Sequence, residues 1–165
     1  MCAQLMRARI FKEKMIRIES ERLIIEPRNF EEMSGIYESE KDPIMKQAYR
    51  EMIDTMLKYS DRSELGCEWK ILLRDGTLVG GACFKGLPDE RGSVEIGYGT
   101  FEAYQCRGYM TEAVGALCDW ALSQPDVHQV EAQIEEGNIA SEKVLLKNGF
   151  IRNGDGEEGP LFVKY

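Results

Sequence analysis

Two neighbouring segments of the chain read VEIGYGT at residues 94–100 and YQCRGYMTEAV at residues 104–114. The first segment alternates like a β-strand, in which successive side chains point to opposite faces. One face carries Val94, Ile96, Tyr98 and Thr100, and the other carries Glu95, Gly97 and Gly99. A strip of glycine lets a ligand approach the backbone, although glycine can also mark a bulge that changes the facing. We interpret this strand as the floor of a binding site that ends in a carboxylate.

The second segment predicts a tight turn into a helix that runs from about Gly108 to Ser123 and stops before Pro125. The first amides of a helix have no acceptor within it, and with the helix dipole they form a site for a polyanion such as a diphosphate. Arg107 adds a positive charge at this turn. An ordinary loop-to-helix junction would explain Gly108 alone, but not the whole string.

Toward the N-terminus, the sequence predicts a strand at residues 22–26 that ends at Pro27. Asn29 is placed to cap a helix that extends to about Glu40, and a second helix is expected after Asp42-Pro43. This second helix carries apolar residues spaced for burial: Met45, Met52, Ile53, Met56 and Leu57. They pack in the core or line a substrate cleft, since methionine adapts to irregular shapes.

The remaining elements complete a mixed α+β domain. Residues 69–84 predict two strands about an Asp75-Gly76 turn, and a further strand is expected at residues 129–134. A helix from Asn138 to Lys147 follows, with Gly149 as its left-handed C-terminal residue. Two last strands are expected, from Phe150 onward and at residues 161–165, on either side of an acidic turn at residues 154–159. The order predicts a mostly antiparallel sheet with helices on both faces.

Composition narrows the class of protein. A chain of 165 residues fits one domain at residues 15–165, with residues 1–14 as an N-terminal extension. It has no secretory signal and no membrane-spanning run, and its five cysteines form no C-x-x-C pair. We therefore expect a cytoplasmic protein without a metal site. The net charge of −8 argues against nucleic acid as a partner and suits a cationic amine, although an acidic surface also simply aids solubility.

The string from Gln105 to Met110 resembles the Q/R-x-x-G-x-G/A signature of the GNAT superfamily of N-acetyltransferases. Several segments resemble its ribosomal-protein N-terminal acetyltransferase-like branch: residues 96–98, 108–113 and 21–25, Asn138-x-x-Ser141, and Gly149-Phe150. The resemblance covers about residues 15–165. It implies the GNAT fold, with a mostly antiparallel sheet of six to seven strands, and acetyl-CoA as cosubstrate without a metal.

The resemblance also implies roles for individual residues. Backbone amides hold the diphosphate of CoA, at Cys106, Arg107, Gly108, Tyr109, Met110 and Thr111. The backbone of Tyr98, Gly99 and Thr100 pairs with the pantetheine arm at the place where this strand and the next one separate, and Asn138 also contacts the arm. Met110 replaces the usual small residue but still supplies an amide. Cys106 occupies a variable position, as a bystander or as a thiol open to acylation.

The expected reaction is attack by a neutral amine on the thioester. Glu95 is the candidate base, directly or through water, or else it orients a cationic substrate or forms a surface ion pair. Many relatives carry a tyrosine seven residues after the asparagine as the acid, but here that position is Leu145, so Ser141 becomes the candidate acid or a plain helix residue. The acceptor is an amine-bearing small molecule or a peptide, and a homodimer is plausible. A non-catalytic, CoA-binding regulatory module remains the alternative.

Overall fold

The computed structural model describes residues 16–165. The predicted extension at residues 1–14, together with Met15, lies outside this described part. The strands are β1 (Ile18–Glu19), β2 (Leu23–Pro27), β3 (Glu68–Leu73), β4 (Leu78–Phe84), β5 (Ser93–Thr100), β6 (Gln129–Gln133), β7 (Ile151–Asp155) and β8 (Pro160–Lys164). The α-helices are α2 (Phe30–Ser39), α3 (Pro43–Lys58), α4 (Tyr109–Leu122) and α5 (Ile139–Lys147), with 3-10 turns η1 (Ser60–Leu65) and η2 (Glu102–Tyr104).

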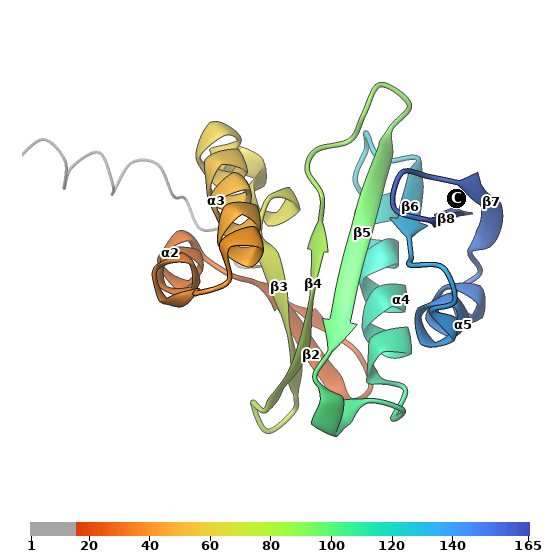
Figure 1. The fold of residues 1–165 in the computed structure, drawn as a ribbon, viewed down its shortest axis with the longest axis horizontal. Helices are drawn as coiled ribbons and strands as arrows, with labels where there is room; N and C mark the ends of the chain where they lie inside the picture. Colours follow the sequence, from red (N-terminus) through yellow and green to blue (C-terminus); the bar gives the residue numbers. More distant parts are fainter. Residues whose placement is uncertain (1–15) are drawn as a thin grey trace, which may run out of the picture.

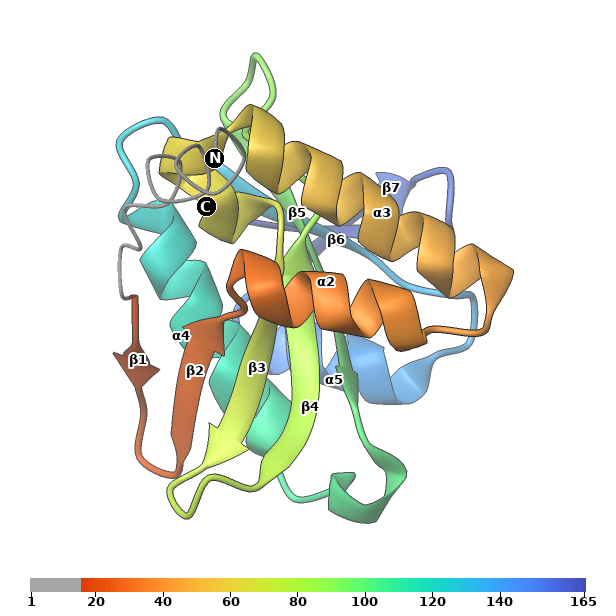
Figure 2. The same ribbon diagram turned by 90° about the vertical axis from the view of Figure 1, so that its left-hand side faces the viewer.

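All these strands join one sheet in the order β1-β2-β3-β4-β5-β6-β8-β7 (Figures 1 and 2). Every pairing is antiparallel except that of β5 with β6. The predicted fold class is confirmed. The described chain has eight strands rather than six or seven, because the two-residue β1 pairs with β2 through Ile18 and Ile25 as an additional edge strand.

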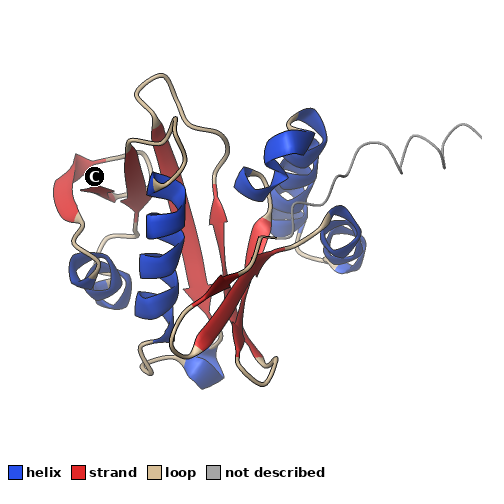
Figure 3. Cartoon of the chain, turned by 180° about the vertical axis from the view of Figure 1, so that it is seen from behind, coloured by secondary structure: helices blue, strands red, loops and turns tan. Residues whose placement is uncertain are grey.

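Helices cover both faces of the sheet, as expected. Helices α2 and α3 lie on one face, and Figure 2 shows them crossing in front of β3 and β4. Helices α4 and α5 lie on the opposite face (Figures 1 and 3). The sheet therefore separates the start of α4 from the side on which α3 packs.

The predicted helix starts follow from local hydrogen bonds. Asn29 forms a capping box with Glu32: its Oδ1 accepts from Glu32 N at 2.8 Å, and Glu32 Oε2 accepts from Asn29 N at 2.9 Å. Asp42 caps α3 by accepting from Ile44 N and Met45 N, and Pro43 occupies the first turn, where no amide is needed. These caps fix where the two helices begin above the sheet.

An aromatic cluster joins α4 to the central strands. The rings of Trp69 on β3 and Trp120 on α4 lie 4.8 Å apart between centroids, and Phe84 on β4 lies 5.7 Å from Trp120. Trp69 and Phe84 are buried, and Trp69 Nε1 donates to Glu64 O at 2.8 Å. Because such aromatic contacts bury large apolar area, they hold α4 firmly against the sheet.

Helix α3 departs from its predicted burial. Met56 is 1% exposed, whereas Met45 is 45% exposed and Leu57 is 47% exposed. The five apolar residues span a wider arc than the face that α3 turns to the sheet.

Strand β7 also differs from its prediction. It extends to Asp155, into the predicted acidic turn.

Candidate active site

Strand β5 separates from β6 halfway along its length. The two strands pair only where Ser93, Val94 and Glu95 face residues 129–131 of β6. Beyond that point, residues 96–100 of β5 keep β4 as their only ladder partner within the described chain. The β6-facing backbone edge of β5 is therefore left without a neighbouring strand, and an extended ligand can pair with it.

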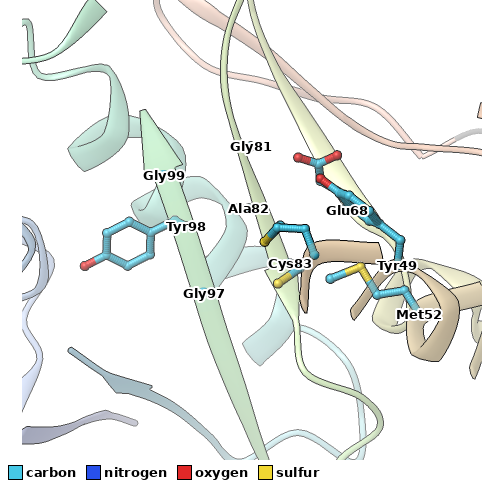
Figure 4. Close-up of a pocket in the computed structure, with 10 residues that line it drawn as sticks. Tyr49, Met52, Glu68, Gly81, Ala82, Cys83, Gly97, Tyr98 and Gly99 are labelled. Atoms are coloured by element: carbon cyan, nitrogen blue, oxygen red, sulfur yellow. The ribbon is translucent and has the colours of Figure 1, made fainter. Parts of the chain in front are cut away.

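The two faces of β5 differ as the sequence predicts. Tyr98 pairs in register with Ala82, and its side chain points away from Cys83 and Glu68 (Figure 4). Gly97 and Gly99 face the α3 side, and a Cβ built on Gly99 would meet nothing within 4 Å. The predicted bare strip is present, without a bulge between β4 and β5.

The turn before α4 presents a run of free amides. Cys106 has φ +59° and Gly108 has φ +78°, so two left-handed residues curl the backbone around one point. Within residues 16–165, no acceptor pairs with any backbone amide from residue 106 to residue 111. Alternating left-handed and right-handed residues at a helix start form an anion-binding nest. The side chain of Gln105 closes the turn onto β5 by donating from Nε2 to Thr100 O at 3.2 Å.

Arg22, which our sequence analysis gave no role in the site, supports this turn from β2. Its Nη1 donates to Arg107 O at 2.9 Å, and its Nε donates to Glu112 Oε2 at 2.7 Å. Glu112 Oε1 also accepts from Arg22 N at 2.8 Å and from Ser20 Oγ at 2.7 Å. Burial raises the pKa of Glu112, but these hydrogen bonds outweigh it and hold that pKa below its ordinary value. The turn is thereby fixed to a strand some 90 residues earlier, a contact that no local sequence signal announces.

Two more cationic contacts shape the same surface. The guanidinium of Arg107 lies 5.8 Å from the ring centroid of Tyr104, and that of Arg22 lies 4.9 Å from the ring of Tyr109. Arg107 is exposed, so its charge is available at the turn as predicted. Cys106 is also exposed.

Helix α5 borders the opening, by which we mean the space beside residues 96–100 of β5 where β6 no longer pairs with it. Asn138 caps it by accepting from Ser141 N at 3.1 Å, and Gly149 has the predicted left-handed conformation with φ +80°. Tyr98 Oη donates to Ser141 O at 3.1 Å, so β5 and α5 are joined across the opening. Burial raises the pKa of Tyr98, which keeps its phenol neutral as a donor. The hydrogen bonds found for Ser141 involve its backbone.

Glu95 lies at the point where β5 and β6 separate. Its Oε1 accepts from Lys85 Nζ at 2.6 Å, and its Oε2 accepts from Gln133 Nε2 at 3.1 Å. Lys85 also donates to Glu158 Oε2 at 2.8 Å, which links the β7–β8 turn to this group. Burial disfavours the charge of Lys85, but its bonds to Glu158 and Glu95 outweigh burial and raise its pKa. Both oxygens of Glu95 are thus engaged.

A cavity of about 180 Å³ lies on the α3 side of the sheet (Figure 4). Its wall is formed by Met45, Tyr49 and Met52 of α3, Glu68 of β3, residues 81–83 of β4 and residues 97–99 of β5. Its wall contains Glu68, which the sequence analysis did not single out, and it does not contain Glu95. Within residues 16–165, no cluster of three or more metal-ligating side chains is found, and no helix is long and apolar enough to cross a membrane.

The sequence profile of the acetyltransferase (GNAT) domain family matches residues 22–151. The chain belongs to the GNAT family. Among curated proteins it is 43% identical, over 86 residues, to an uncharacterized N-acetyltransferase, YjdG, of Bacillus subtilis. That match covers 52% of this chain and 51% of YjdG, so the chain spans about half the length of this relative.

Solved GNAT structures share the fold. A RimL ribosomal-protein α-N-acetyltransferase in complex with coenzyme A superposes with a TM-score of 0.69 at 16% identity, covering 90% of this chain and 97% of that one. RimJ of Mycobacterium smegmatis, in complex with a CoA disulfide, gives a TM-score of 0.67 at 16% identity, covering 91% and 86%. The predicted resemblance to ribosomal-protein acetyltransferases is confirmed for the fold.

This GNAT chain has no acid at the position of Leu145. Leu145 is fully buried in the hydrophobic core, and its carbonyl accepts from Phe150 N at 3.1 Å. The side chain at this position therefore lies in the hydrophobic core. The other predicted residues form two groups, one at the α4 turn and one along the opening between β5 and α5.

Proposed function

We propose that the chain transfers an acetyl group from acetyl-CoA to a primary amine. GNAT acetyltransferases use acetyl-CoA, and the observation that carries the proposal is the run of six free amides at residues 106–111 beside the open edge of β5. A diphosphate needs several donors converging on one point, and the curled turn supplies them together with the positive end of α4. An ordinary helix start would leave only about four amides free.

The residues around the opening have matching roles in this proposal. The amides of Cys106, Arg107, Gly108, Tyr109, Met110 and Thr111 hold the diphosphate. The backbone of Tyr98, Gly99 and Thr100 pairs with the pantetheine arm, which then takes the place that β6 leaves empty. Asn138 at the start of α5 contacts the same arm from the other side.

Acetyl-CoA supplies an acetyl group activated as a thioester. The amine must be neutral to attack, which costs about 4.6 kcal/mol at pH 7 for a lysine-like amine and about 1.1 kcal/mol for an α-amine. Glu95 is the proposed base, through water, because Lys85 and Gln133 hold its carboxylate in place at the closed end of the opening. Of these two amines, the α-amine costs less to deprotonate.

The remaining steps follow the charge. The new C–N bond forms at the carbonyl carbon, and an amide from residues 97–99 is placed to donate to the carbonyl oxygen as negative charge develops there. The C–S bond then breaks, and the thiolate takes up one proton from water or from Ser141, the candidate side-chain donor. The amine loses one proton, and the products are the N-acetylated amine and free CoA.

Calorimetric titration with acetyl-CoA and a thiol-release assay across an amine panel test the proposal together. We expect binding and turnover with at least one amine. Binding without turnover on any amine would support a non-catalytic, CoA-binding module. The absence of an acid at the position of Leu145 also favours this alternative. No affinity for acetyl-CoA would overturn both readings.

Glu95→Gln tests the base. We expect kcat/KM to fall by about 100-fold, within the range of a lost general base, with acetyl-CoA affinity unchanged. Glu131→Gln is the matched control, because Glu131 pairs with Glu95 in register, is ion-paired with Arg91 at 3.3 Å, and is similarly shielded, 14% against 21% exposed. Equal kinetics of the two variants would remove Glu95 from the reaction.

A further inference from the structure

Among residues 16–165, Glu68 supplies the one carboxylate in the wall of the α3-side cavity. Its Oε2 accepts from Arg28 Nε at 2.8 Å, whereas no hydrogen bond to its Oε1 is found within residues 16–165. Glu68 is 25% exposed, and its charge, after burial, helps to raise the pKa of the neighbouring Tyr49. One oxygen is thus held by a fixed cation, and the other remains able to accept from a ligand.

The sheet is cleared of side chains to receive this carboxylate. A Cβ built on Gly81 would collide with Glu68 Oε1, so the carboxylate lies directly over the backbone of β4. Gly81 pairs with Gly99 of β5, one strand spacing of about 4.8 Å away. The free oxygen of Glu68 therefore lies next to the bare strip of β5, along whose other edge the proposed coenzyme runs.

The rest of the cavity wall is apolar. Met45 and Met52 of α3 line it, and Tyr49 contributes its ring. Ile44, one residue before Met45, is 81% exposed. The cavity has a volume of about 180 Å³, whereas sites that enclose a drug-sized ligand have volumes of about 300–1,000 Å³. The cavity therefore admits a single short group. Because the carboxylate of Glu68 lies in an otherwise apolar pocket, the pocket favours a ligand that carries a cationic group on an aliphatic stem.

We propose that the acetyl acceptor is a protonated primary amine on a short aliphatic stem, which binds in the α3-side cavity with its ammonium at Glu68 Oε1. This inference rests on the proposed function. Glu68 binds and selects the acceptor, whereas Glu95 has both oxygens engaged by Lys85 and Gln133. The ammonium then lies beside the bare strip and, before the amine attacks, gives its proton through water to Glu95, the proposed base. A free amino acid or an acidic peptide terminus is disfavoured by its own carboxylate near Glu68.

Binding of small probes tests the ion pair without turnover. In the presence of CoA, we expect n-pentylammonium to bind the full-length protein and 1-pentanol, its neutral analogue, to bind at least about tenfold more weakly. Glu68→Gln keeps the shape and an acceptor for Arg28, and we expect it to weaken n-pentylammonium about tenfold while 1-pentanol and CoA are unaffected. Glu26→Gln is the matched control: Glu26 lies on adjacent β2, is paired with Lys70 at 3.1 Å, is 28% exposed, and does not line the cavity.

The pH profile separates recognition from a structural role. The charged or titratable groups that face Glu68 are Arg28, Tyr49 and Cys83, and of these only Arg28 is charged at neutral pH. An ion pair with Glu68 raises the pKa of the bound amine, so kcat rises with pH up to that raised value. In Glu68→Gln we expect KM for the amine to rise about tenfold and the rising limb of kcat to move about one pH unit lower. A merely structural role would change neither the limb nor the preference for ammonium over alcohol.

Assays with two classes of substrate show whether the amine belongs to a small molecule or to a peptide. Small aliphatic amines and the peptide Met-Ala-Ala-amide, with its N-acetylated form as the blank, are assayed side by side; turnover of either class that depends on Glu68 supports the inference. Wild-type kinetics and probe binding in Glu68→Gln would overturn it while leaving acetyl transfer intact. Absence of turnover in the wild-type protein with every amine would instead count against the proposed function, and the n-pentylammonium titration would still decide the role of Glu68.

Discussion

The α4 turn and the α3-side cavity lie on different sides of β5 and are built in opposite ways. The turn uses backbone amides from six consecutive residues, stiffened by Arg22 and Gln105. The cavity uses side chains from α3 and β3 above the cleared backbone of β4 and β5. A site made of backbone amides forms in any chain that can adopt the turn. A site made of side chains can change its ligand when one of those side chains is substituted. We therefore expect variants in one region to leave the other region's ligand almost unaffected.

The largest effect is expected for Gly108→Val. Gly108 has φ +78°, where a β-branched residue is strained, and its new Cβ would lie 3.3 Å from Arg22 Nη2. Distortion of the amide run should weaken acetyl-CoA by about 100-fold, on the order of 3 kcal/mol. Titration calorimetry measures it. Gly154→Val carries similar strain at φ +81° on the distant β7 and should leave acetyl-CoA binding unchanged. If both variants bind acetyl-CoA equally, the turn does not hold the coenzyme.

The converse variant is Gly81→Ala on the cavity side. The added methyl would displace the carboxylate of Glu68, which is the far end of a flexible side chain, so the fold should tolerate the change. We expect KM for the amine to rise about fivefold, from partial loss of a charged hydrogen bond, with acetyl-CoA affinity within twofold of wild type. Steady-state kinetics at saturating acetyl-CoA measure the first and calorimetry the second. Loss of acetyl-CoA affinity in this variant would show that the two regions are not independent.

The same contrast explains what the sequence could and could not predict. Strand β5, the turn at Gly108 and the caps at Asn29 and Asn138 each depend on residues within a few positions, and the structure has them where they were predicted. The separation of β5 from β6 came only from the family resemblance. Arg22 and Glu68 acquire their roles through partners 90 and 40 residues away, so no local pattern indicates them. The exposure of Met45 likewise depends on how α3 sits over the sheet.

A smaller effect is expected from loosening the support of the turn. Glu112→Gln weakens charge-assisted bonds to Ser20 and Arg22, which should lower the free energy of unfolding by about 1–2 kcal/mol at pH 7 and weaken acetyl-CoA about threefold. The folded-state pKa of Glu112 is lowered, so its stabilisation is complete above its unfolded value near 4.5 and disappears as pH falls through the lower folded value. Urea unfolding of both proteins from pH 7 to pH 3 should show the difference shrink only in acid. A constant difference across that range would mean that the charge of Glu112 is irrelevant.

The smallest effect is expected for Ser141→Ala. The contacts of Ser141 with Asn138 and Tyr98 use its backbone, so alanine preserves the link between β5 and α5. A thiol with a pKa of about 8.5 gives a thiolate that leaves readily and can be protonated by water. A side-chain acid therefore adds little to the rate. We expect kcat to fall by less than about threefold, with acetyl-CoA affinity unchanged. A fall of about 100-fold with unchanged binding would instead make Ser141 the general acid that Leu145 cannot be, and the opening beside α5 would then hold a catalytic side chain as well as backbone contacts.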